Sequence, residues 1–205
     1  MGRNSSGNRG GLQPGDSSYK GSITGVEPLR NMNPQAYKDT KAAISRYHAV
    51  MGVRQREVHL ANLSAGTLGV HVSAGDGKGN IKSEAVYLNK KVFKQPRSVQ
   101  LKQTKQGYDS GWHTKTNKPM AHTVTHELAH ATWNSHLTGA NQKAAGKEIN
   151  QLYKTWKKDK KKKGYGKYAE TNANEFWAET VTKAVHGKAD KYTKAVKKIA
   201  KKYKL

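Results

Sequence analysis

The most informative stretch of this sequence is His126-Glu127-Leu128-Ala129-His130, in which two histidines are four positions apart. On an α-helix, residues four apart lie on one face, with Cβ atoms about 5–6 Å apart. Both imidazoles can then reach one metal ion, while Glu127 projects to the side, where it can hold a water molecule at the metal. This H-E-x-x-H pattern is typical of zinc metallopeptidases.

The residues around the motif predict that its helix is buried. They are small or apolar: Thr123, Val124, Leu128, Ala129 and Ala131. Buried histidines need polar partners, and a metal ion is one such partner. The motif alone does not exclude an alternative, namely a surface helix whose two histidines have no function.

A third ligand is needed, because a catalytic zinc takes three protein ligands and keeps one position open. The 205-residue chain has no cysteine, so the ligand must be a histidine or a carboxylate. Glu175 and Glu179 are the best candidates, since they lie four apart on one face of a predicted helix. We expect one to bind the ion and the other to accept a hydrogen bond from a ligand histidine. The alternative is an amphipathic helix with an exposed pair of acids.

Residues 168–179 resemble the third-ligand region of the anthrax lethal factor-like metallopeptidases, a branch of the gluzincins. In that family, H-E-x-x-H is followed by a tyrosine and, seven residues later, by a ligand glutamate in a Glu-aromatic-aromatic-Ala-Glu run. Here the tyrosine is Tyr168, and the run is Glu175-Phe176-Trp177-Ala178-Glu179. The resemblance covers about residues 85–187.

The resemblance implies a role for each of these side chains. The ligands of one Zn²⁺ ion would be His126, His130 and Glu175. Glu127 would be the general base, and the Tyr168 hydroxyl would stabilise the oxyanion or protonate the leaving amine. Glu179 would support a ligand from outside the coordination sphere.

The sequence Gly111-Trp112-His113, followed by Pro119 and the motif helix, is similar to phage-encoded members of this group. Such members are associated with head morphogenesis or minor head proteins. The resemblance therefore implies a peptide or protein substrate, phage structural proteins as partners, and a place in the virion or in the cytoplasm of the infected bacterium. The chain shows no delivery or receptor-binding domain, which does not favour a toxin.

Two neighbouring histidines have weaker indications. His122 lies one turn before His126 and could be an alternative ligand or a supporting group, but we expect it to face solvent or the rim of the site. His113 lies in a Gly/Trp loop and is a candidate for substrate contact. The strand predicted at residues 85–89, with an extension to 93 left open, could bind substrate by β-augmentation, or it could be an ordinary internal strand.

The order of the predicted elements indicates an α+β fold with a small mixed sheet, a motif-bearing helix and a helical C-terminal half. Residues 1–32 are expected to be a flexible tail, and residues 33–205 a zincin-like domain that ends in a lysine-rich helix. Strands are predicted at 58–63, 68–72 and 85–89, with a turn at 75–80 and a polar connection at 95–118. Helices are predicted at 34–50, 119–136, 140–160, 172–186 and 189–203.

The formal net charge of +24 favours polyanionic partners. It is densest near four consecutive lysines: Lys160, Lys161, Lys162 and Lys163. No base-reading motif is present, so nucleic acid contact would be non-specific and sensitive to salt. The alternative for this lysine segment is a solvated helix end. The sequence shows neither a secretory signal nor an apolar stretch long enough to cross a membrane, so we expect no membrane partner and no secretion.

Two hypotheses therefore stand. The first is a zinc-dependent endopeptidase of the lethal factor-like type, which hydrolyses peptide bonds of a phage or host protein. The second is a basic virion- or nucleic-acid-associated protein whose zincin domain is structural or vestigial. They differ on Glu127, which binds no metal and serves catalysis alone.

Overall fold

The computed structural model describes residues 21–53, 55–75, 81–134 and 139–205. The strands are β1 (Thr24–Pro28), β2 (Val58–Asn62), β3 (Gly69–Gly75) and β4 (Ile81–Asn89). The α-helices are α1 (Pro34–Met51), α2 (Lys90–Phe93), α3 (Arg97–Asp109), α4 (His122–Asn134), α5 (Gly139–Lys158), α6 (Ala173–His186) and α7 (Lys191–Tyr203). Short 3-10 helices are η1 (Leu29–Asn31), η2 (Pro119–Ala121) and η3 (Lys167–Glu170).

The four strands form one mixed sheet in the order β1-β2-β4-β3. β2 and β4 run parallel, whereas β1 and β3 pair antiparallel with their neighbours. Alternate residues such as Leu60, Val86 and Leu88 are fully buried, because they face the helices that cover one side of the sheet. This order leaves β3 at one edge and β4 in the interior.

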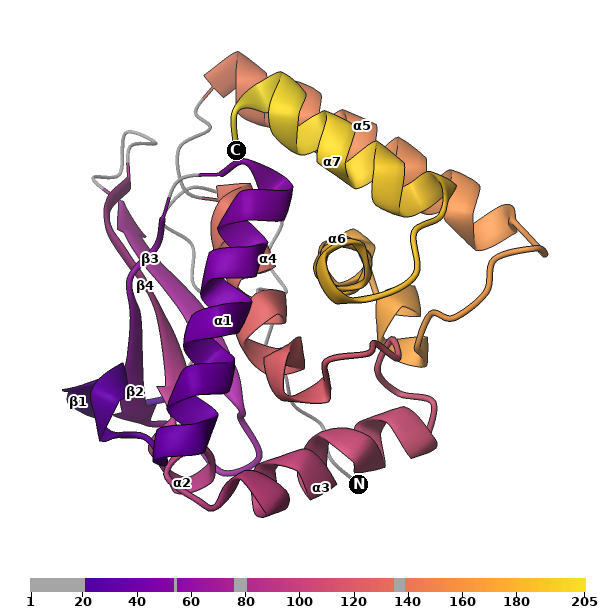
Figure 1. Cartoon of the computed structure of the whole chain (residues 1–205). Coiled ribbons are helices and arrows are strands. Elements are labelled where there is room, and N and C mark those ends of the chain that lie inside the picture. The colour runs from indigo at the N-terminus through magenta and orange to yellow at the C-terminus, as the bar shows by residue number, and fades with distance from the viewer. Residues whose placement is uncertain (1–20, 54, 76–80, 135–138) are drawn as a thin grey trace.

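The helices form further layers beyond the sheet. Figure 1 shows α1 and α4 against the sheet, α6 beyond α4, and α5 beside α7 on the far side of α6. Two buried hydrogen bonds tie α4 to its neighbours: Tyr47 on α1 donates to the Leu128 carbonyl, and Trp177 on α6 donates to the Ala129 carbonyl. The motif helix is therefore enclosed on several sides.

Side-chain caps explain where the helices begin. The Asn33 side chain accepts two backbone N–H groups at the start of α1, with Pro34 in the first turn. Asn172 caps α6 in the same way, and Asp190 forms a capping box with Thr193 at α7. Polar residues at these positions are signals that sequence alone provides.

Two segments that the sequence predicts to lack regular structure contain a helix and a strand. The predicted polar connection at 95–118 contains α3, a helix that buries only Gln100 and so shows little apolar periodicity. The predicted tail at 1–32 contains β1, which joins the sheet by pairing with β2 although Val26 stays 52% exposed. Backbone pairing at a sheet edge leaves a weak sequence pattern, which explains this error. Residues 1–20 and most of the predicted turn at 75–80 lie outside the described residues.

The α+β fold with a small mixed sheet and a helical C-terminal half is confirmed. The helices at 34–50, 140–160, 172–186 and 189–203 match α1, α5, α6 and α7 within two residues at each end. In the part of the chain that the structure describes, none of the helices has the length and apolarity to cross a membrane.

Candidate metal centre

Two histidines of α4 and one glutamate of α6 converge on a single point. His126 Nε2 lies 3.1 Å from His130 Nε2, and Glu175 Oε2 lies 3.2 Å from the first nitrogen and 3.3 Å from the second. Each of the three residues is at most 3% exposed. We call His126, His130 and Glu175 the metal group, because these buried side chains could hold a metal ion.

The dimensions of the metal group fit a tetrahedral ion. With metal–nitrogen and metal–oxygen bonds of about 2.0–2.1 Å, neighbouring ligand atoms stand roughly 3.3 Å apart. The three measured separations match that value. Moreover, Glu175 Oε2 is buried and makes no hydrogen bond of acceptable geometry, even though both imidazole nitrogens lie within 3.3 Å. A cation would satisfy this oxygen and both nitrogen lone pairs together.

The electrostatics of the metal group favour an ionised carboxylate. Burial by itself raises the pKa of Glu175, but the close approach of the two histidines outweighs it and lowers the pKa to about 2. Burial likewise lowers the pKa of His126, yet the neighbouring carboxylates of Glu175 and Glu179 raise it well above its usual range. The site therefore attracts positive charge, whether as protons or as a metal ion.

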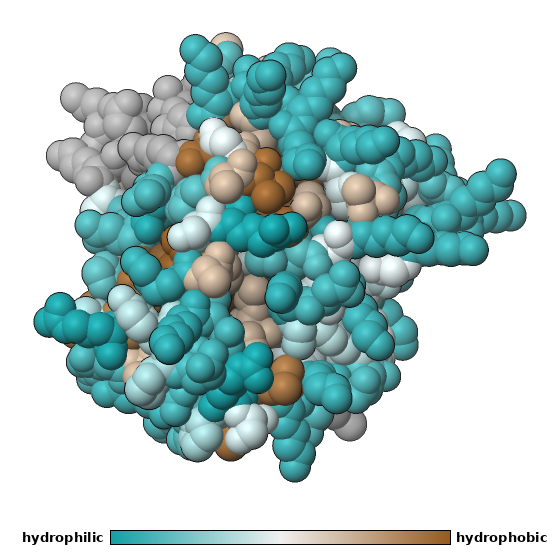
Figure 2. Space-filling view, in the orientation of Figure 1, coloured by the Kyte–Doolittle hydropathy of each residue, from teal (hydrophilic) through white to brown (hydrophobic). Residues whose placement is uncertain are grey.

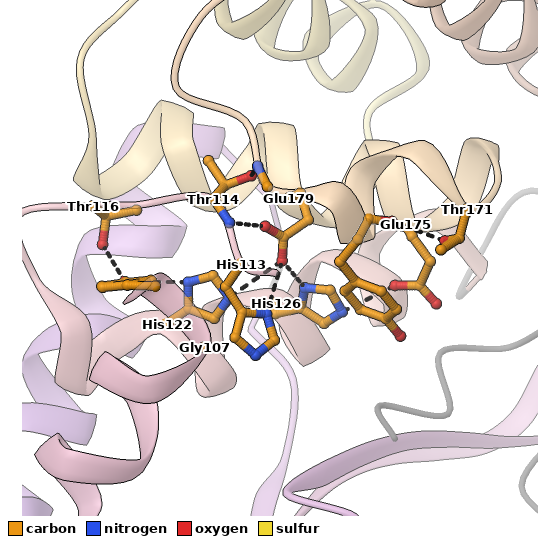
Figure 3. Close-up of polar contacts among 12 residues, drawn as sticks. Gly107, His113, Thr114, Thr116, His122, His126, Thr171, Glu175 and Glu179 are labelled. Atoms are coloured by element: carbon orange, nitrogen blue, oxygen red, sulfur yellow. Dashed lines mark hydrogen bonds and ion pairs between the residues drawn. The ribbon is translucent and has the colours of Figure 1, made fainter. Parts of the chain in front are cut away.

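Glu179 lies one helical turn beyond Glu175 and holds His126 from its other side. Its Oε1 is 3.0 Å from His126 Nδ1, and its Oε2 accepts a hydrogen bond of 2.6 Å from the Thr114 backbone N–H (Figure 3). Glu179 is completely buried. An imidazole that donates from Nδ1 to a carboxylate keeps its Nε2 lone pair for a metal, which is the arrangement expected from the sequence.

Glu127 is buried beside the metal group but is not part of it. Its Oε2 has no hydrogen-bond partner, and burial raises its pKa despite the nearby histidines. Strand β3 packs directly against this side chain: a Cβ added at Gly69 would lie 2.7 Å from Glu127 Cγ, and the His71 backbone hydrogen-bonds the carboxylate. Sequence reasoning did not find Gly69, because the approach of β3 to α4 is a tertiary contact.

Tyr168 in η3 lies flat against the His126 imidazole. The two rings are 5.5 Å apart at an interplanar angle of 19°, and Trp112 stacks on Tyr168 at 5.4 Å. The Tyr168 backbone N–H donates to the Trp112 carbonyl at 2.9 Å, which fixes η3 to the segment before α4. The structure thus brings Tyr168 to the two histidines of the metal group, which are far from it in sequence.

His122 differs from its prediction. Rather than facing solvent or the rim, it is 2% exposed, and its Nε2 lies 3.2 Å from Glu179 Oε1. The physical reason is the four-residue spacing: His122 and His126 share one face of α4, and α6 covers that face with Glu179. His113 lies beside it, with ring centroids 4.7 Å apart.

The strand predicted to bind substrate is an internal one. Residues 85–89 belong to β4, which pairs with β2 on one edge and β3 on the other. Its backbone hydrogen bonds are therefore already used. The edge strand beside α4 is β3.

The lysine segment, residues 160–163, follows the end of α5 on the surface. Lys160, Lys161 and Lys163 are exposed, while the Lys162 ammonium lies 4.3 Å from the Trp156 ring. Figure 2 shows hydrophilic side chains over α5 and α7 in this view. Three of its lysines, Lys161, Lys162 and Lys163, also line a surface hollow of about 730 Å³ together with Lys115, Lys188 and Lys191.

Comparisons with known proteins leave the chain without an assigned relative. The sequence matches no protein-family model, and neither the curated proteins nor the solved structures include a significant match to it.

Proposed function

We propose that this protein is a zinc-dependent endopeptidase of the lethal factor-like gluzincin type. The observation that carries the proposal is the placement of Glu127, a buried carboxylate beside three convergent ligand atoms with one oxygen free of hydrogen bonds. Burying a carboxylate without full hydrogen bonding costs free energy, and such groups are found preferentially at functional sites. A purely structural metal site has no need of it.

The metal group would hold the zinc through His126 Nε2, His130 Nε2 and Glu175 Oε2. A zinc ion there supplies Lewis acidity, which lowers the pKa of water and polarises a peptide carbonyl. Glu179 keeps His126 in the tautomer that presents Nε2, because it accepts the Nδ1 hydrogen. Two histidines and one carboxylate leave a fourth position open for water or substrate.

Glu127 acts in this proposal as the general base. Burial raises its pKa, which makes the carboxylate a better proton acceptor near neutral pH. It takes a proton from the attacking water and passes it to the departing amide nitrogen. The contact with Gly69 limits where the carboxylate can lie, so β3 positions the base.

Tyr168 acts as a hydrogen-bond donor to the negative charge that develops on the scissile carbonyl oxygen. Support comes from its ring, which stacks on His126 and so places the tyrosine beside the ligand atoms. Stacking with Trp112 restricts the ring. A donor that is already oriented costs little reorganisation during the reaction.

We infer that the substrate is an extended peptide that pairs with β3. This strand lies at the edge of the sheet and contacts α4 at Glu127. Pairing with an edge strand fixes the peptide backbone and leaves its side chains to determine specificity. A phage origin, with a phage or host protein as substrate, follows from the sequence resemblance alone.

The second candidate is a basic virion- or nucleic-acid-associated protein with a structural or vestigial zincin domain. The exposed lysine segment and the net charge of +24 favour it. The two candidates differ in whether Glu127 matters. Contact with phosphate groups would need the lysines but not this glutamate.

The test is the Glu127→Gln variant of the zinc-loaded full chain, assayed on a broad peptide library. Glutamine keeps the shape but cannot accept the proton, so we expect unchanged zinc content and loss of cleavage by at least about 100-fold. Glu57→Gln is the matched control, because the Glu57 side chain is 77% exposed. Wild-type protein that holds zinc but cleaves none of the library would overturn the proposal.

A further inference from the structure

A second group of potential ligands lies next to the metal group. It consists of His113, His122 and Glu179, which each offer one ligand atom within 4.8 Å of the others. His122 comes from the first turn of α4, Glu179 from α6, and His113 from the segment between α3 and η2. Figure 3 shows both imidazoles directed toward the Glu179 carboxylate.

Nitrogen atoms crowd one oxygen of this second group. Glu179 Oε1 lies 3.2 Å from His122 Nε2, 3.8 Å from His113 Nδ1 and 3.0 Å from His126 Nδ1. His113 Nδ1 is buried and has no hydrogen-bond partner. Glu179 Oε1 is hydrogen-bonded to His126 Nδ1 and to His122 Nε2, whereas His113 Nδ1 makes no hydrogen bond. A cation in place of the His122 hydrogen would contact this oxygen and the nitrogens of both His113 and His122.

The surroundings hold this arrangement in place. A Cβ at position 107 would lie 2.1 Å from His113 Cδ2, so only glycine lets α3 pack against that ring. The Thr114 backbone N–H fixes the other oxygen of Glu179. When a cation replaces the hydrogen between His122 Nε2 and Glu179, the Tyr108 hydroxyl, 3.3 Å from His122 Nδ1, can accept the hydrogen that the imidazole then carries on Nδ1.

We propose that the second group binds a divalent transition-metal ion of its own, held by His113 Nδ1, His122 Nε2 and Glu179 Oε1. Two imidazoles and one carboxylate select zinc, cobalt or copper over magnesium and calcium, which prefer oxygen ligands. The His113 side chain is 17% exposed, so an ion can reach the group from solvent. Neither the sequence motif nor the proposed catalysis requires this ion.

The second ion binds more weakly than the first. Glu179 Oε1 has to serve both the new ion and the Nδ1 hydrogen of His126, and the two ions repel each other across the imidazole. Binding at either site therefore lowers affinity at the other by the same factor, which we expect to be about tenfold. The metal group fills first because none of its three ligand atoms is shared with the second group.

Metal counting tests the proposal without any assay of peptide cleavage. Metal-free full-length protein is titrated with buffered free Co²⁺ and, in a separate titration, with buffered free Zn²⁺. Bound metal is measured at each free-metal concentration. We expect two ions per wild-type chain, bound in two phases. His113→Gln removes the weaker phase only, because glutamine cannot supply the imidazole nitrogen, and His130→Ala removes the tighter phase only.

The matched control is His59→Gln, a change in a histidine whose side chain is 31% exposed and which belongs to neither group. It should leave both phases intact. One ion per wild-type chain at saturating metal would overturn the proposal, as would two full phases in His113→Gln. Circular dichroism of each variant, and the tight phase retained in His113→Gln, show that the fold survives the change.

The absorption spectrum of bound cobalt gives a second measure. Ligand-field bands report nitrogen coordination, so His113→Gln should remove the bands that grow in the second phase and spare those of the first. Glu127→Gln should bind two ions like the wild type. Wild-type protein that binds two ions but cleaves no peptide would contradict the proposed peptidase and support the second site. Protein that cleaves peptides but binds a single ion would support the peptidase and contradict the second site.

Discussion

Glu175 and Glu179 in the α4–α6 interface are at most 2% exposed, whereas Lys160, Lys161 and Lys163 after α5 are exposed. Burying an ion costs several kcal/mol unless partners replace its water, but a solvated lysine carries almost no such cost. The two glutamates are surrounded by histidine nitrogens, which supply those partners. The buried carboxylates of the interface are therefore placed to bind cations, whereas the lysines after α5 are placed to contact solvent or polyanions.

The largest expected effect in this comparison belongs to Glu175→Ala. At free zinc low enough to fill only the metal group, this variant should lose most of its bound ion, because one of three ligands is gone. His122→Ala should keep nearly one zinc per chain under the same conditions. Metal analysis after dialysis measures both. If His122→Ala loses more zinc than Glu175→Ala, then Glu175 is not the third ligand.

A smaller effect is expected for Glu179→Gln. The amide still occupies the space but binds the His126 Nδ1 hydrogen less strongly, so affinity for the first ion should fall about 10–100-fold. Competition with a chromophoric chelator measures this change. Glu148→Gln, at a surface carboxylate on α5, is the control and should behave like wild type. Equal affinity in Glu179→Gln and wild type would mean that Glu179 does not support the ligand.

The interface also predicts a pH dependence through His186. This histidine on α6 lies 2.8 Å from the Thr125 hydroxyl of α4, and burial lowers its pKa from 6.5 to about 4. The unfolded chain takes up the proton near pH 6.5, and the folded chain only near pH 4. The contribution of neutral, buried His186 to the unfolding free energy is thus fully present above pH 6.5 and is lost as the pH falls toward 4.

Between pH 7 and pH 4.5, His186 should cost the metal-free protein about 2 kcal/mol of unfolding free energy. Urea unfolding of wild type and His186→Gln at both pH values measures this, since glutamine does not titrate. The variant should lose correspondingly less stability on acidification. Identical losses in the two proteins would show that His186 is not held neutral by burial.

The smallest effect on stability belongs to the lysine segment. Alanine at Lys160, Lys161, Lys162 and Lys163 together should change the unfolding free energy by no more than about 0.5 kcal/mol per site. If these lysines bind phosphate groups, the slope of log affinity for duplex DNA against log salt should become shallower by about 0.9 for each lysine–phosphate pair removed. Alanine at four lysines of α7, namely Lys194, Lys197, Lys198 and Lys201, is the charge-matched control. Wild type that fails to bind DNA at low ionic strength would remove nucleic acid from the partners.

Local signals predict most of the elements but not those that depend on neighbours. Asn33 with Pro34, and the acid pair on α6, mark their helices by residue type and spacing. The helix α3 and the strand β1 escape prediction, because one buries a single residue and the other has an exposed apolar side chain. Their stability comes from contacts with other segments, which local periodicity cannot show.

For the candidate site, the sequence by itself determined the inventory. Two histidines four apart and two glutamates four apart must share helix faces, because the α-helix has 3.6 residues per turn. Only the tertiary structure decided which of these faces meet, through the packing of α4 against α6. The same packing buries His122, whereas Gly69 reaches the site through the contact of β3 with α4, and His113 through the segment between α3 and η2. Each of these depends on contacts between segments far apart in the chain.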